Sequence, residues 1–223
     1  MPRRYNSKET VELILSTSMK LFHEKGFDKT SMQEIVDASG VSKGSIFHHF
    51  RSKEEILTAV IVNQAKAHDQ IIRKWLDEME GVTAKEKMIA LLDRVFEGAD
   101  VGADPLDVQV LKSPQMILAI MQESLKIVAP TYAKIFKEAM KDGSLTTTRP
   151  DQCAEAFVLL MNYWCNPILF ACDAQNLLDR ILFLQQMMRS LGADVITDRH
   201  IAAFRKLSEA LIDGGIEHGI DSE

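Results

Sequence analysis

The chain has 223 residues, of which 46% are apolar and 26% charged, and it contains only 11 Gly and 6 Pro. This composition excludes disordered, collagen-like and low-complexity proteins, and the length suffices for a full hydrophobic core. The longest apolar stretch, residues 158–172, is interrupted by Asn162, Asn166 and Pro167, and is too short and too polar to span a membrane. No export signal follows the basic N-terminus, so we expect a cytoplasmic protein without a membrane segment.

Charges are distributed unevenly along the chain. Residues 1–53 carry nine Lys and Arg against six Asp and Glu, whereas the whole chain has a formal net charge of −6. A basic N-terminal quarter on an acidic protein favours a head that binds a polyanion. The three cysteines, at positions 153, 165 and 172, are odd in number and lack a metal-binding spacing, so we predict neither a disulfide framework nor a metal site.

The first quarter of the chain predicts three helices in close succession. Apolar residues at helical spacing predict a helix over residues 7–25. Ser31 and Glu34 then form a capping-box pattern that starts a short helix, and Ser42 caps a third helix over residues 43–49. Two short helices joined by a glycine-containing turn, with a further helix in front, are typical of a helix-turn-helix.

The rest of the sequence has a helical pattern and no strand alternation. A capping box at Ser52 opens a long helix to about Met79, and a last helix covers roughly residues 198–212. We therefore predict an all-α protein. Residues 1–53 would form a three-helix, helix-turn-helix DNA-binding head, and residues 54–223 a larger helical body for effector binding and dimerisation.

Two segments of the body carry heptad-like apolar repeats, one over residues 154–172 and the other over residues 177–191. We expect each helix to bury one face in its own subunit and to offer another to a twin chain, which gives a homodimer. A disulfide between the two subunits stays open as a role for the cysteines. The predicted interface residues are Val158, Met161, Cys165, Ile181, Leu184 and Met188.

Polar and aromatic residues interrupt the first of these repeats beside Pro167. Proline frees the carbonyl of Tyr163, so we expect a kink with an exposed acceptor. The residues around the kink either accommodate packing or line a ligand cavity. His68, on the apolar stripe of the long helix, is either a core histidine or a pocket residue that senses ligand or pH. The candidate effector residues are His68, Met116, Met121, Tyr132, Asn162, Tyr163 and Asn166.

Two segments of the first quarter carry a resemblance to a known family. LFHEKGFDKTS at residues 21–31 and IVDASGVSKGSIFHHFRSKEEIL at residues 35–57 follow one another in an order that resembles the tetracycline-repressor (TetR) family of bacterial transcriptional regulators. The rest of the chain is similar to that family only in its length and helical pattern.

The resemblance implies binding to a double-stranded DNA operator. It implies phosphate contacts for Thr30, Ser31 and Lys53, and a groove-facing surface made by Lys43, Gly44, Ser45, Phe47 and His48. Ser42 starts the same helix, whose free N–H groups favour phosphate. The family usually has Tyr where this chain has Phe47, so a hydroxyl contact to phosphate is missing and only apolar contact is left, for example with a thymine methyl. Arg3 and Arg4 are either a minor-groove arm or merely terminal charge.

These features together predict a sequence-specific DNA-binding regulator. The resemblance implies a repressor that an effector releases from a near-palindromic operator, with the long helix transmitting the signal. The aromatic and Met-rich body favours a small, largely apolar effector. A helical binding or scaffold protein that recognises a protein or lipid, with little role for the head, is the alternative. An enzyme is not expected and no cofactor is predicted, because the sequence has no phosphate-binding glycine loop, nucleophile elbow or helical metal-ligand pair.

Overall fold

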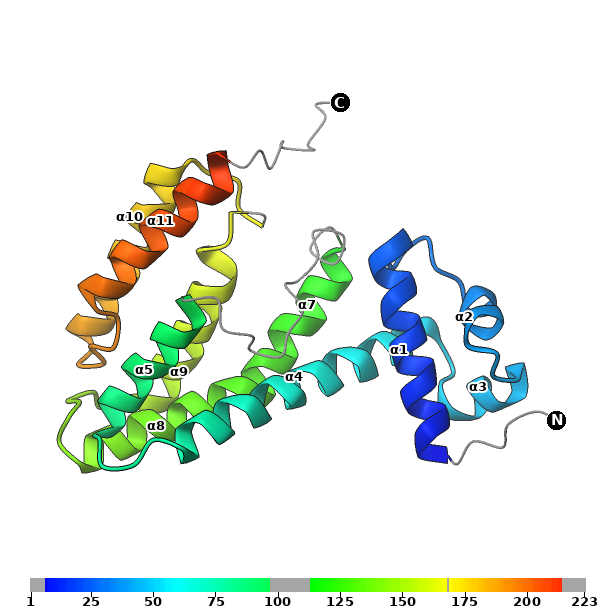
Figure 1. Ribbon diagram of the computed structural model, residues 1–223, viewed down its shortest axis with the longest axis horizontal. Coiled ribbons are helices and arrows are strands. Elements are labelled where there is room, and N and C mark those ends of the chain that lie inside the picture. Colours follow the sequence, from blue (N-terminus) through cyan, green and yellow to red (C-terminus); the bar gives the residue numbers. More distant parts are fainter. Residues whose placement is uncertain (1–6, 97–112, 168, 214–223) are drawn as a thin grey trace. The chain divides into compact units, whose positions relative to one another are not determined.

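The computed structural model describes residues 7–96, 113–167 and 169–213, and these residues form helices and turns without a strand (Figure 1). The prediction of an all-α fold is confirmed. The helices are α1 (Ser7–Lys25), α2 (Met32–Ser39), α3 (Lys43–His49), α4 (Lys53–Asp77), α5 (Ala84–Phe96), α7 (Pro114–Glu123), α8 (Ala129–Lys141), α9 (Pro150–Leu159), α10 (Ala174–Ser190) and α11 (Asp198–Asp213). Two further segments, η1 (Ser124–Val128) and η2 (Leu160–Trp164), are π-helical.

Packing divides the chain into two compact units. The first, called the head unit here, comprises Met1–His68 and Gly102–Ser124, and the second, the body unit, comprises Asp69–Val101 and Leu125–Glu223. Helix α4 contributes its first part to the head unit and its last part to the body unit. The expected division at residue 53 therefore differs from the division that packing makes, which falls within α4.

The head unit has a core that each of its helices helps to build. Ile14 and Phe22 of α1, Ile35 of α2 and Ile46 of α3 are fully buried in it. The turn between α2 and α3 depends on Gly40, whose φ of +64° lies in the left-handed region and whose N–H donates to the carbonyl of Val36. The predicted helices of the head are confirmed, with the bounds of α1 and α3 as expected.

This core continues into α4 and α7. Ile56, Leu57 and Val60 on α4 are buried in it, and so is Met116 on α7. Met116 is therefore part of the core of the head unit, and its role in an effector pocket stays a prediction.

In the body unit, α8 packs against α5 and α9, and α10 packs against α9, η2 and α11. Helix α11 also contacts α5. The side chains between these helices form one apolar core, which includes Met88, Leu91, Phe136, Ala154, Phe157, Leu177, Ile181, Leu184, Met188 and Val195. These apolar side chains thus pack against one another within one subunit.

The expected helix over residues 154–172, with a kink near Pro167, is shorter in the structure, since the helical run ends at Trp164. The chain first widens into the π-turn η2, in which Cys165 N donates to the carbonyl of Leu160 at 2.9 Å. Asn166 N then donates to the carbonyl of Tyr163 at 3.1 Å, so this carbonyl is not the exposed acceptor that we expected. Pro167 cannot extend the helix because it lacks an N–H.

The interface predicted from the heptad repeats is also wrong for five of its six residues. Val158, Cys165, Ile181, Leu184 and Met188 are buried in the core of their own body unit, and only Met161 is partly exposed. A heptad repeat gives the spacing of an apolar stripe but does not say which partner covers it. Here the partners are the neighbouring helices of the same chain.

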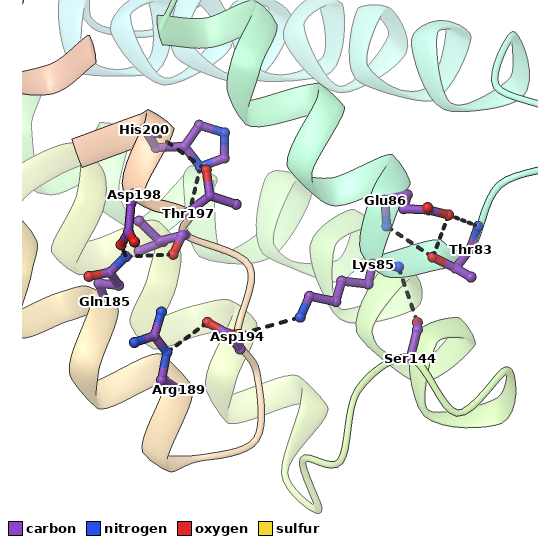
Figure 2. A network of polar contacts seen from close by, with 11 residues as sticks. Thr83, Lys85, Glu86, Ser144, Gln185, Arg189, Asp194, Thr197, Asp198 and His200 are labelled. Carbon is purple, nitrogen blue, oxygen red and sulfur yellow. Dashed lines mark hydrogen bonds and ion pairs between the residues drawn. The ribbon is translucent and has the colours of Figure 1, made fainter. Parts of the chain in front are cut away.

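Polar side chains tie the turn between α10 and α11 to its neighbours (Figure 2). Asp194 in this turn pairs with Lys85 of α5 at 3.4 Å and with Arg189 of α10 at 3.1 Å. Buried Gln185 donates to the carbonyl of Ile196 at 2.9 Å and to Asp198 at 3.0 Å. The start of α11 is therefore held by side chains of two other helices.

Among the residues that the structure describes, none of the helices has the length and apolar character that crossing a membrane requires.

Candidate nucleic-acid interface

The outer face of α3 is the most distinctive surface of the head unit. Lys43, Gly44, Phe47 and His48 are exposed on it, while Ile46 on the opposite side is fully buried. These positions are one and four residues apart, so they share one face of the helix. Helix α3 thus presents a basic, aromatic and small-residue surface on a base that the core holds rigid.

Two serine hydroxyl groups predicted to lie at the DNA interface cap the helices of the head. Ser42 accepts a hydrogen bond from Ser45 N at 3.3 Å and starts α3. Ser31 starts α2 with a full capping box, as predicted, because Glu34 N donates to its hydroxyl and Ser31 N donates to the Glu34 carboxylate at 2.8 Å. Both serines are exposed, so they combine a structural role with access to solvent.

The start of α2 already holds a negative charge. The Glu34 carboxylate accepts from the N–H and the hydroxyl of Ser31, and Lys25 pairs with it at 2.7 Å. The hydrogen bond from Lys25, followed by those from Ser31, lowers the pKa of Glu34 to about 2. The phosphate contact implied for Ser31 stays a prediction, and it would place an anion beside this carboxylate.

Thr30 does not fit the role that the resemblance implies. Its side chain is only 2% exposed, and its hydroxyl donates to the carbonyl of Gly26 at 2.8 Å. It also lies 3.4 Å from the carbonyl of Leu21 near the end of α1. The prediction that the Thr30 side chain touches phosphate is therefore wrong, because this hydroxyl satisfies backbone carbonyls inside the head.

Lys53, at the start of α4, turns toward the loop between α1 and α2. Its ammonium group donates to the carbonyl of Phe27 at 2.8 Å and lies 4.3 Å from the centre of the Phe27 ring. The carbonyl of Asp28 is 3.4 Å away. Lys53 thus ties α4 to the loop before α2. Its two partners there, Phe27 and Asp28, lie 26 and 25 positions earlier in the sequence.

We expect Lys53→Met to lower the free energy of unfolding of the head unit by about 1–2 kcal/mol, because it removes a charged hydrogen-bond donor but keeps the apolar stem. Denaturation followed by loss of helical circular dichroism measures the change. Lys66→Met, on the exposed side of the same helix, is the control and should change stability little. Equal stability of the two variants would contradict this role for Lys53.

The candidate effector residues do not gather in one unit. His68, Met116 and Met121 belong to the head unit, whereas Tyr132, Asn162, Tyr163 and Asn166 belong to the body unit. Among the latter, Tyr132 and Tyr163 are buried, Asn166 is half-buried and Asn162 is exposed. Burial, followed by the nearby negative charge of Asp69, raises the pKa of the Tyr132 hydroxyl well above its usual range.

Sequence reasoning missed a polar cluster between the last part of α4 and α8, in which Asp69 and Thr131 are buried and Arg73 is exposed. Asp69 accepts a hydrogen bond from Arg73 Nε at 2.6 Å and another from the Thr131 hydroxyl, and Arg73 Nη2 reaches the Thr131 oxygen at 2.7 Å. The i, i+4 spacing of Asp69 and Arg73 is the only part visible in the sequence. A hollow of about 250 Å³ beside the cluster shares no residue with the candidate effector set and is lined by Arg73, Leu76, Asp77, Lys87, Thr131, Lys134, Ile135 and Glu138.

The described residues contain no group of three or more His, Cys, Asp or Glu side chains that could hold a metal ion. His48 and His49 make an edge contact, with ring centres 5.3 Å apart.

All three cysteines are free, and burial raises the pKa of the Cys165 thiol to about 12. The Cys165 thiol is thus protonated at neutral pH, which makes it a poor nucleophile. Arg3 and Arg4 lie outside the described residues.

Comparison with known proteins identifies the helix-turn-helix. The family profile described as "Bacterial regulatory proteins, tetR family" matches residues 14–60. The chain is 22% identical over 183 residues to the HTH-type transcriptional regulator UidR of Escherichia coli K12, which covers 80% of this chain and 89% of UidR. It is 49% identical over 89 residues to the uncharacterized HTH-type transcriptional regulator YerO of Bacillus subtilis, covering 40% of this chain and 31% of YerO.

A solved structure extends the similarity of fold to most of the chain. The crystal structure of a TetR-family transcriptional regulator from Mesorhizobium loti superposes with a TM-score of 0.59, at 20% identity, and covers 92% of this chain and 98% of that one. The relatives named here are regulators. The matched segment contains most of α1, all of α2 and α3, and the start of α4. The chain therefore carries the DNA-binding helix-turn-helix of TetR-family transcriptional regulators.

Proposed function

We propose that this regulator is a repressor that binds a near-palindromic operator as a homodimer and leaves it when a small, largely apolar effector binds the body unit. The observation that carries the proposal is the outer face of α3, where Lys43, Phe47 and His48 are exposed on a helix that buried Ile46 anchors to the core. A helix of this kind fits the major groove, which admits one α-helix.

The side chains on this face divide into two kinds of contact. Lys43 and His48 can donate hydrogen bonds to base edges or phosphates, whereas exposed Gly44 lets the backbone approach the DNA closely. In a symmetric dimer, each head would read one half-site, and the two half-sites would be related by the same two-fold axis as the subunits. This is the reason for expecting a near-palindrome.

TetR-family regulators are typically dimers, and we propose the outer face of α10 as the interface in place of the buried repeat. Phe183 is 57% exposed on this face, Leu182 beside it is also exposed, and the Trp164 ring contacts Phe183 edge to face. Phe170, after η2, is a further exposed aromatic residue. Aromatic side chains are enriched at subunit interfaces relative to the rest of the protein surface.

The effector would act by favouring one spacing of the two heads over another, because equal affinity for both spacings shifts nothing. The segment η2 supports an effector site in the body unit, since π-helical turns occur frequently at functional sites. Tyr132 and Tyr163 are the buried aromatic candidates for this site. The cluster of Asp69, Arg73 and Thr131 joins the last part of α4 to α8, so a ligand that displaces α8 would also pull on α4.

Selection of bound sequences from a random duplex pool tests the proposed DNA recognition. We expect the purified protein to enrich a near-palindromic motif whose half-sites lie about one helical turn, or a multiple of it, apart. The variant Lys43→Ala/His48→Ala should bind that motif about 1,000-fold or more weakly, because each lost base contact costs about 1–3 kcal/mol and two contacts are lost in each of the two heads. Lys66→Ala, which removes one positive charge about 20 Å along α4 from Lys53, is the control and should retain the motif.

A folded dimer that enriches no motif would refute the proposal and favour the binding or scaffold protein. Enrichment of a motif that the double variant binds as well as wild type would refute the role of α3. Addition of candidate small apolar compounds to the complex, followed by fluorescence anisotropy of the labelled operator, tests release. A compound that increases operator affinity instead would contradict release by an effector.

A further inference from the structure

The phenyl ring of Phe47 is exposed on the head unit, and the hydrogen bonds proposed for Lys43 and His48 give it no role in DNA binding. It is 42% exposed on the outer face of α3, although the same helix buries Ile46 completely. A phenyl ring has no donor or acceptor, so it can bond neither a phosphate oxygen nor the polar edge of a base. An exposed ring in the middle of a DNA-reading surface needs an apolar partner in the complex.

The major groove offers one apolar group on its base edges, the C5-methyl group of thymine. The other groups there are the nitrogen and oxygen atoms that donors and acceptors read. A thymine methyl is therefore the partner that fits Phe47. This argument rests on the chemistry of the side chain and of the groove, and it requires that α3 enter the groove as proposed above.

Lys43 stands one helical turn before Phe47 on the same face, and its ammonium group lies 5.9 Å from the centre of the ring. A lysine ammonium most often reads the O6 and N7 acceptors of guanine. Successive bases on one strand are about 3.4 Å apart along the axis. Lys43 and Phe47 are four residues apart, a rise of about 6 Å along α3, which corresponds to one or two base steps.

We infer that Phe47 and Lys43 together read a thymine methyl and a guanine that lie within two base steps of each other in each operator half-site. This inference rests on the proposed function and specifies which chemical groups of the operator determine its recognition. It makes Phe47 a residue that determines sequence specificity. The alternative is that Phe47 merely occupies the position of a tyrosine that contacts phosphate.

Substitution of single atoms or groups in the operator tests the inference. Deoxyuridine in place of each thymine removes only the methyl group, and 7-deazaguanine in place of each guanine removes only the N7 acceptor. We expect deoxyuridine at one thymine per half-site to weaken wild-type binding about fourfold per half-site, the effect of one buried methyl group. We expect 7-deazaguanine at a guanine within two steps to weaken it about tenfold per half-site, the effect of one hydrogen bond to a charged donor.

The protein variants then assign each loss to a residue. Phe47→Ala should bind the thymine and deoxyuridine operators equally well, while keeping the penalty for 7-deazaguanine, and Lys43→Ala should show the reverse. Leu118→Ala is the control, because Leu118 is another large apolar residue of the head unit and is 56% exposed on α7. It should keep both penalties. Since Phe47 lies outside the core, thermal unfolding of Phe47→Ala should match that of wild type.

Three results would overturn the inference. The first is a wild-type protein that binds every deoxyuridine operator as well as the unmodified one. The second is a deoxyuridine penalty of the same size in Phe47→Ala and wild type, and the third is a sensitive thymine and guanine more than two steps apart. Each of these would leave the proposed function intact, because they require an operator that the protein binds. Failure to select any operator would instead contradict the proposed function.

Discussion

Gly192→Ala is expected to lower the free energy of unfolding of the body unit by about 3 kcal/mol. Gly192 follows α10 with a φ of +73°, a left-handed conformation that costs a residue with a Cβ about 1–2 kcal/mol. A Cβ at this position would also lie 2.7 Å from the backbone of Thr146 and Thr147. Relief of that overlap requires the backbone to shift, at a cost of about 1–3 kcal/mol.

The contact is close because two backbone segments bond to each other there. The carbonyl of Gly192 accepts hydrogen bonds from Thr146 N at 3.0 Å and from Thr147 N at 3.1 Å. These bonds join the loop between α8 and α9 to the turn between α10 and α11. A side chain that separates the segments would weaken both bonds, so the effect of the substitution reaches two loops.

Urea denaturation followed by tryptophan fluorescence measures this effect in the right part of the chain, because Trp75 and Trp164 both belong to the body unit. Gly81→Ala is the matched control. Gly81 has a φ of +74°, but nothing lies within 4 Å of the position of its Cβ, so only the backbone cost of about 1–2 kcal/mol applies. Equal losses in the two variants would contradict the steric part of the argument.

The head could be predicted from the sequence because each of its helices begins and ends on local signals. The Ser31 and Glu34 capping box, the Ser42 cap and the turn at Gly40 all act within a few residues, and the structure has each of them. The role of Thr30 could not be predicted in this way. Its burial depends on the end of α1 nine residues earlier in the sequence, where it bonds the carbonyl of Leu21.

In the body, the sequence predicted helices but not their partners. The apolar spacing of α10 is real, yet the stripe with Ile181, Leu184 and Met188 meets the core of its own chain, and the exposed apolar residues are the adjacent Leu182 and Phe183. Hydrophobic periodicity cannot separate these two outcomes, because both faces are apolar. The cluster of Asp69 and Thr131 was missed for a related reason, since its members are 62 residues apart and only folding brings them together.

His200→Ala is expected to lower the stability of the body unit by about 2–3 kcal/mol, because His200 combines a buried side chain with a helix cap. Its side chain is 1% exposed, at the third position of α11. Thr197 N donates to His200 Nδ1 at 3.1 Å, and His200 N lies 3.4 Å from the Thr197 hydroxyl, as Figure 2 shows for the first contact. This is the geometry of a capping box in which histidine takes the place of Glu or Gln.

The cap fixes the tautomer of the ring. Because Nδ1 accepts a hydrogen bond from a backbone N–H, the proton of the neutral imidazole is on Nε2, which faces Asp93 of α5 at 3.1 Å. Burial lowers the pKa of His200 from 6.5, although Asp93 and the carbonyl of Ile89 oppose the shift and Arg199 adds to it. Protonation would also place the Nδ1–H of the ring against the N–H of Thr197. This repulsion disfavours the charged imidazolium and therefore lowers the pKa of His200 further.

The sign of the pH dependence follows from this lowered pKa. Between the folded and unfolded pKa values the unfolded chain holds more protons, so stability rises with pH. The contribution of His200 is complete above about pH 6.5, the pKa of an unperturbed histidine, and is lost as the pH falls through the lower pKa of the folded protein. Acid should therefore loosen the start of α11 and its contact with α5.

His200→Gln separates this effect from the other titrating groups. The Gln oxygen can accept from Thr197 N and its amide can donate to Asp93, so we expect most of the stability at pH 8 to be kept. Urea denaturation from pH 8 to pH 5 measures the unfolding free energies of wild type and His200→Gln. As the pH falls, the unfolding free energy of wild type should decrease relative to that of His200→Gln. A difference that stays constant over this range would mean that folding does not shift the pKa of His200, and that its role is confined to capping and packing.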